Sequence, residues 1–370
     1  MSILEASKEA LRDVSLMFGG GKRFSDARHQ DAPSHLIFGT VVRTAPIEEG
    51  GELVLLDWQE KDIEKRVPIV PRNPDIEEDP NPRGNTRGCR GVRYSGDRIF
   101  ATSYHTLEVY DDRLQKIETL SDGLMVGLHE IALTKQETVL VTSTAIDGVI
   151  EYDLESHTRR RSFWPREMSA LQQRLSLKSL SLDKEADNRL AFLAPSKTDS
   201  ESHLHLNAVE IHDGTVYALS NAHGAILDLS RGQVVVEHER LRGGHNLIVL
   251  DEGTAVVNDT YGGAVCFYDL DEKTLTRTID LKAFRWVREL IRWKIPAYWG
   301  KELARKVGLL EHSVAKPLFV RGLVRRDSHL FVGVSPAAIL RLNWRTGELV
   351  DAYQYSADVH VCVHGLDVVD

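Results

Sequence analysis

Three histidines recur at equivalent positions of a repeated strand motif and could together hold a metal ion. They are His129, His245 and His364, and each of them opens a short, largely apolar segment. Neutral imidazoles bind zinc, iron and copper, and a three-histidine cap leaves coordination positions for water or a substrate. Such a metal lowers the pKa of its bound water toward neutrality. The pattern predicts a zinc, iron or copper site with these three ligands, and Glu130 beside it as an acid or base.

Two arginines at the same repeat position favour a different ligand. Arg90 and Arg321 would place fixed positive charges beside a divalent cation, which is unfavourable unless an anion lies between them. Planar guanidinium groups bind sulfate, phosphate or carboxylate well, with the histidines then donating protons or attacking. A third interpretation is structural: the imidazoles would hydrogen-bond backbone and water and hold the strands in register. Three further polar residues would contribute to ligand binding: His205, Asn207 and Asn246.

The elements that must position these residues form a repeat. Each unit has short apolar segments separated by turn residues, and most units end in a more polar segment such as 274–280. Four strands per unit, recurring about every 40 residues, are typical of a β-propeller. Six units can be stacked, although 161–200 could contain an irregular seventh. In chain order, the first inner-strand position holds Arg90, His129, Leu206, His245, Arg321 and His364.

The sixth unit is divided between the two ends of the chain. Residues 361–370 open a unit that is not continued, and the missing strands match 36–41 and 52–58. A ring of repeats closes in this way when one blade takes strands from both termini. We therefore predict an all-β fold: a six-bladed β-propeller over residues 36–370, closed by N- and C-terminal strands in one blade, with a helical insertion. Residues 1–35 are predicted to be a helix and an extended arm.

Composition excludes several classes of function. A net charge of −9 argues against nucleic-acid binding, which requires a basic surface. No apolar run is long enough to span a bilayer. The N-terminal segment lacks the pattern of a secretory signal. The three cysteines form no CxxC pair, which is typical of a reducing compartment. These features predict a cytoplasmic protein. The ring of histidines and arginines predicts that it binds a small molecule in the central channel.

Two insertions interrupt the repeat. Residues 161–204 are polar, with a helical pattern over 168–175. Residues 281–318 interleave tryptophans with lysines and arginines and predict two helices broken at Pro296. This basic pair could lie on an anionic membrane, contact a partner protein, cover the channel or pack on the rim. If the axial ring has no chemistry, the protein would be a non-enzymatic ligand-binding or interaction scaffold that docks through this insertion.

Parts of the chain resemble known propellers. The segments 162–165, 205–207 and 321–323 with 331–335 resemble a group of uncharacterised bacterial six-bladed propeller proteins, which implies a fold and no reaction. The segment 203–209 with 217–220 and 225–229 more weakly resembles the blade motif of arylsulfotransferase-type propellers. That second resemblance implies a transferase in which a channel histidine takes a sulfuryl group. An export signal, expected of the bacterial arylsulfotransferases, is missing here.

Overall fold

The structure is a computed structural model that describes residues 32–71, 86–191, 203–309 and 315–369. Residues 33–370 form one compact unit. The predicted N-terminal helix lies outside the described residues. Within the described part of the chain, none of the helices has the length and apolar character that a bilayer-spanning segment requires.

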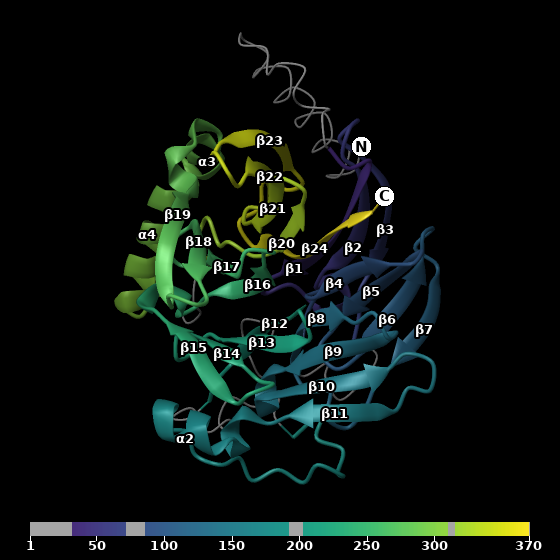
Figure 1. Cartoon of the computed structure of the whole chain (residues 1–370). Helices are drawn as coiled ribbons and strands as arrows, with labels where there is room; N and C mark the ends of the chain where they lie inside the picture. The colour runs from purple at the N-terminus through teal and green to yellow at the C-terminus, as the bar shows by residue number, and fades with distance from the viewer. Residues whose placement is uncertain (1–31, 72–85, 192–202, 310–314, 370) are drawn as a thin grey trace. The chain divides into compact units, whose positions relative to one another are not determined.

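Six four-stranded antiparallel sheets form a ring (Figure 1), which confirms the predicted six-bladed β-propeller. The first complete blade contains β4 (Val92–Ser95), β5 (Arg98–Thr102), β6 (Leu107–Asp111) and β7 (Lys116–Leu120). The second contains β8 (Leu128–Leu133), β9 (Thr138–Ser143), β10 (Gly148–Asp153) and β11 (Arg159–Phe163). The third contains β12 (Leu206–His212), β13 (Thr215–Ser220), β14 (Ala225–Asp228) and β15 (Gln233–Glu237).

The remaining blades complete the circle. The fourth contains β16 (His245–Val249), β17 (Thr254–Asp259), β18 (Ala264–Asp269) and β19 (Thr274–Asp280). The fifth contains β20 (Leu323–Arg326), β21 (His329–Val334), β22 (Ala338–Asn343) and β23 (Leu349–Gln354). The sixth contains β24 (Val361–Val369), β1 (His35–Val42), β2 (Glu52–Asp57) and β3 (Asp62–Pro68), in that spatial order. No seventh sheet occurs among the described residues.

The sixth blade closes the ring as the split repeat predicts. The C-terminal strand β24 is its innermost strand and pairs antiparallel with β1, from His35 opposite Val369 to Val42 opposite Val361. The inner strands contact one another in a complete circle, in the order β4, β8, β12, β16, β20, β24 and back to β4. Apolar side chains of adjacent blades pack together between the sheets, whereas the outer strand β3 is alternately exposed. This burial holds the blades in place.

Irregular backbone at the start of the inner strands directs side chains toward the axis. The register shifts within β8 between Leu128 and Ile131, within β12 at Asn207 and within β16 at Asn246. Asn246 has a left-handed φ of 55°. Bulges of this kind change the direction of a side chain and are frequent beside functional sites. They explain why two successive residues, such as His245 and Asn246, both reach the inside of the ring.

Close approach of inner strands requires glycine at position 365. A Cβ atom there would lie 2.1 Å from the carbonyl oxygen of Arg90, which belongs to rigid backbone. We expect Gly365→Ala to lower the free energy of unfolding by about 3 kcal/mol, because β24 or the Arg90 segment must shift. Urea unfolding measures the effect.

The matched control is Gly300→Ala. No atom lies within 4 Å of a Cβ built at Gly300. Alanine there should be neutral or slightly stabilising, since it favours a helix interior over glycine. Equal stability of both variants would contradict the close packing around Gly365.

Both insertions differ in detail from the prediction. The polar insertion begins later than residue 161, because 159–163 is the edge strand β11; α2 (Ser169–Leu175) follows. The basic insertion contains α3 (Arg285–Ile291) and α4 (Lys294–Lys306). The predicted break at Pro296 is wrong. The helices separate at residues 292–293, and Pro296 lies in the first turn of α4, where its missing N–H costs nothing.

Candidate functional site

The three predicted histidines come together on the axis. Each is at most 5% exposed, and each offers a ring nitrogen within 4.8 Å of those of the other two. The His129 ring centroid lies 4.6 Å from that of His364 and 5.1 Å from that of His245, and the remaining pair is 5.9 Å apart. Three blades therefore contribute one imidazole each to a single cluster, which we call the histidine cluster.

The tautomer of His245 is fixed by its neighbours. Its Nδ1 lies 2.8 Å from Thr260 Oγ1 and 3.1 Å from the carbonyl oxygen of Gly243. The Thr260 hydroxyl donates to the carbonyl of Val320, so Nδ1–H of His245 donates to both oxygens. Its Nε2 therefore carries a lone pair, which receives a 3.2 Å contact from Asn207 Nδ2. A ligating histidine is usually oriented by such a hydrogen bond from its other nitrogen.

His129 and His364 have buried nitrogens without hydrogen-bond partners. These atoms are Nδ1 of His129 and both ring nitrogens of His364. An unpaired buried polar atom costs about 1–3 kcal/mol, so a bound group that satisfied them would be stabilising. Burial lowers the pKa of all three imidazoles well below the usual value, and Arg321 lowers it further. The cluster is thus neutral at pH 7, as metal ligands must be.

Three arginines make the surroundings of the cluster electropositive. The guanidinium carbons of Arg43 and Arg321 lie 4.2 and 4.5 Å from the ring centroid of Phe319. Arg90 donates to the carbonyl of Leu128 at 3.2 Å. Nε of Arg321 is buried without a partner, and burial lowers the pKa of Arg321 to about 9, with smaller contributions from Arg43 and Arg90. Burying a positive charge without a partner is unfavourable, so an anion bound beside Arg321 would be stabilising.

Glu130 lies beyond the cluster, in a second layer of charged groups. Its Oε1 accepts a 2.9 Å hydrogen bond from Asn246 Nδ2, across the axis. Burial raises the pKa of Glu130 to about 8, and Arg93 and Arg321 lower it only in part. Burial likewise raises the pKa of Glu210 to about 7. At neutral pH the Glu130 carboxyl is largely protonated, and so it can donate a proton.

This layer makes folding stability dependent on pH. The folded-state pKa of Glu130 exceeds that of the unfolded chain, so its stabilising effect is complete below pH 4.5 and is lost as pH rises through about 8. We expect stability to fall by up to about 1.4 kcal/mol per pH unit for this group in that window. Glu130→Gln should flatten the fall, and urea unfolding from pH 5 to 8.5 tests it. Glu137→Gln, on an exposed turn, is the control; identical pH profiles for the two variants would contradict the assignment.

Sequence reasoning missed a chain of hydrogen bonds beside the cluster. The carboxylate of Asp147 accepts from His203 Nδ1 at 2.9 Å and from the backbone N–H of His205 at 2.9 Å. His203 Nε2 then accepts from His205 Nδ1 at 3.3 Å. Arg166 lies 3.4 Å from the same carboxylate. This arrangement, the Asp147–His203–His205 chain, leaves Nε2 of His205 with a lone pair. The His-x-His spacing at 203–205 was the signal available in the sequence.

The Asp147–His203–His205 chain of hydrogen bonds joins the buried His205 to the partly exposed His203, and burial lowers the pKa of His205 to about 3. His205 has a left-handed φ of 53° and acts electrostatically on both His129 and His245, which places it near the cluster. The side chain of His203 is 17% exposed. A carboxylate that orients one imidazole, which in turn receives a proton from a second, is the arrangement of a general base with its positioning groups.

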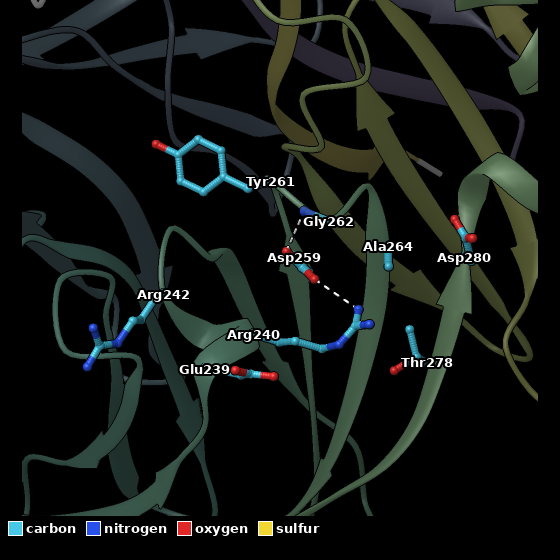
Figure 2. Close-up of a pocket in the computed structure, with 9 residues that line it drawn as sticks. All are labelled: Glu239, Arg240, Arg242, Asp259, Tyr261, Gly262, Ala264, Thr278 and Asp280. Carbon is cyan, nitrogen blue, oxygen red and sulfur yellow. Dashed lines mark hydrogen bonds and ion pairs between the residues drawn. The ribbon is translucent and has the colours of Figure 1, made fainter.

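A cavity of about 410 Å³ is lined by residues 239–242 and by residues of the fourth blade (Figure 2). Its centre is the ion pair of Arg240 with Asp259, at 3.1 Å, between the third and fourth blades. Tyr261 lines it and packs edge-on against Phe319 at 5.7 Å. Phe319 in turn lies beside Arg321 and, at 6.1 Å, His245. The cavity and the histidine cluster are therefore linked through one aromatic pair.

Most of the predicted residues lie around the axis, but their surroundings differ. Leu206 packs in a hydrophobic cluster between blades, so the third ring position belongs to His205 and not to Leu206. The amide of Asn246 is fully engaged: its oxygen accepts from Asn258 and from the backbone N–H of Gly322. Asn207 Oδ1 is buried without a partner. Asn207 is thus better placed than Asn246 to contact a ligand.

Comparison with known proteins identifies the fold alone. No protein-family model matches the chain, and no curated protein matches it. A crystal structure of a protein of unknown function from Bacteroides caccae is similar, with a TM-score of 0.56 and 8% identity. The match covers 90% of this chain and 98% of that one. It agrees with the expected resemblance to uncharacterised bacterial propellers.

Proposed function

We propose that the axial site binds a divalent transition metal through His129, His245 and His364, and a small anionic ligand through Arg90 and Arg321. The observation that carries this proposal is the convergence of three buried neutral imidazoles, two of which have nitrogens without hydrogen-bond partners. The unpaired Nε of Arg321 supports the anion. Zinc, iron and copper all accept imidazole ligands.

The reaction best supported is hydrolysis or group transfer on an anionic substrate. A bound metal would supply a Lewis acid and a water molecule of lowered pKa. Arg321 and Arg90 would orient the anionic group and stabilise charge that develops on it. His205 Nε2 would accept a proton while the separate proton on its Nδ1 passes to Nε2 of His203. The cavity beside Tyr261 would hold the rest of the substrate.

Metal analysis of the purified protein tests the proposal. We expect one zinc, iron or copper per chain after incubation with each metal and gel filtration. His245→Ala should lower the affinity by at least about 100-fold, because one of three ligands is lost. His212→Ala, near the protein surface, should retain the metal. Absence of bound metal in the wild type would contradict the metal site.

A second candidate is anion binding without a metal. Asn207 Nδ2 already contacts the lone pair of His245 Nε2, and the imidazoles and arginines together offer many donors. In that case calorimetry would show binding of sulfate or phosphate to metal-free protein, lost in Arg321→Leu. If neither metal nor anion binds, the axial ring is structural and the scaffold interpretation remains.

A further inference from the structure

The helix α4 presents an apolar surface that the fold does not use. None of its residues is buried. Ile295, Trp299 and Leu303 follow one another at intervals of four, so they share one face of the helix. Trp299 is 62% exposed and Leu303 is 63% exposed. Just outside the helix, Trp293 is 77% exposed. This face contributes little to the stability of the propeller.

The neighbouring helix α3 anchors the pair to the propeller. Val287 and Ile291 are buried in the core between the fourth and fifth blades. Trp286 and Leu290 pack against the same cluster. In Figure 1, α3 and α4 lie at the outer edge of the ring, beside β19. α3 therefore holds α4 outside the ring, with its apolar face in solvent.

The same segment carries a positive charge that contrasts with the acidic protein. Residues 282–306 contain eight lysines and arginines and only two glutamates, whereas the whole chain has a net charge of −9. Two of the arginines pair locally, Arg292 with Glu289 and Arg305 with Glu302. The ion pairs of the described residues do not include Arg285, Lys301 or Lys306. These three charges remain available to an external anionic surface.

We propose that α3 and α4 dock the protein on an anionic lipid membrane, with Trp293, Trp299 and Leu303 inserted at the level of the head groups. Exposed tryptophan and leucine beside lysine and arginine are the combination that interfacial helices use. Each basic residue near an anionic bilayer adds to the attraction. The apolar face argues against nucleic acid, since phosphate contacts alone would leave it in water.

Vesicle co-sedimentation with the full chain tests this proposal. Vesicles of phosphatidylcholine alone are compared with vesicles containing roughly one-third phosphatidylserine, at low and high salt. We expect binding only to the anionic vesicles, weakened by salt, with a blue shift of tryptophan fluorescence. Trp299→Ser combined with Leu303→Ser should lower the affinity about tenfold or more, and so should the triple substitution R285E/K301E/K306E.

A control variant changes the net charge by the same amount as R285E/K301E/K306E, but at positions outside α3 and α4. R113E/K135E/R231E replaces exposed residues at turns of the first, second and third blades and should bind like the wild type. Failure of the wild type to bind anionic vesicles would overturn the proposal, as would equal losses in the control. In one alternative outcome the wild type does not bind vesicles but forms a dimer, and Trp299→Ser/Leu303→Ser converts that dimer to a monomer. This outcome would contradict membrane docking and would assign the apolar face to a second copy of the chain. Metal content should be unchanged in all variants, so this test is independent of the axial site.

Discussion

Deletion of residues 361–370 is expected to abolish the cooperative unfolding transition of the protein. The deletion removes β24, which is the innermost strand of its blade and lies between the inner strands β20 and β4 in the ring. It also leaves the inner edge of β1 without a partner strand and exposes the apolar surface that Leu366 covers in the intact protein. An unclosed ring with an unpaired edge strand should aggregate or remain partly unfolded. Thermal melting followed by circular dichroism measures the loss.

Two controls separate the role of the strand from that of its histidine. His364→Ala keeps β24 and should unfold cooperatively, although it lacks a metal ligand. A synthetic peptide of residues 361–370, added to the truncated protein, should restore part of the transition because the inner position of the blade is then filled. A truncated protein that melts like the wild type would show that the ring does not depend on closure by β24.

Replacing Arg321 with leucine is expected to change the two proposed ligands in opposite directions. Loss of a positive charge beside the histidine cluster should raise metal affinity at least about tenfold, since a like charge no longer opposes the dication. Removal of the guanidinium should lower the affinity for sulfate or phosphate by about 100-fold. Calorimetric titrations of zinc and of sulfate into the same protein measure both effects.

Arg325→Leu is the matched control for this prediction. Arg325 lies on β20 of the same blade, but it pairs with Asp251 at 3.1 Å on the outside. Its substitution should change neither affinity appreciably, because exposed ion pairs are weak and distant from the axis. A parallel decrease of both affinities in Arg321→Leu would indicate disruption of the site, and would contradict separate metal and anion positions.

The fold could be predicted from sequence because its signals are periodic and local. Type I′ hairpin turns such as Asp213-Gly214, with both φ values positive, determine strand pairing directly. The split repeat was visible because residues 363–369 match the opening of the other units. Positions on inner strands of successive blades necessarily meet at the axis. The three histidines could therefore be placed together without coordinates.

The chemistry around the histidines could not be predicted in the same way. The bulge at Asn207 shifts the register, so His205 reaches the site and Leu206 turns into the core. Its partner Asp147 lies in the preceding blade, 58 residues earlier. Arg43, which follows β1 of the sixth blade, and Arg321, which precedes β20 of the fifth, both contact the ring of Phe319. Such contacts depend on tertiary geometry, and the repeat pattern of the sequence does not predict them.

The antiparallel pairing of β1 with β24 determines how the ring would respond to mechanical tension. His35 lies opposite Val369, so the first residue of β1 and the last residue of β24 lie at the same end of one strand pair. A pulling force applied through residues 35 and 369 would load the hydrogen-bonded pairs one at a time and peel the strands apart. Attachment at residues 35 and 361 would instead load the pairs together in shear. Force spectroscopy should therefore find the propeller weak in the first direction and much stronger in the second.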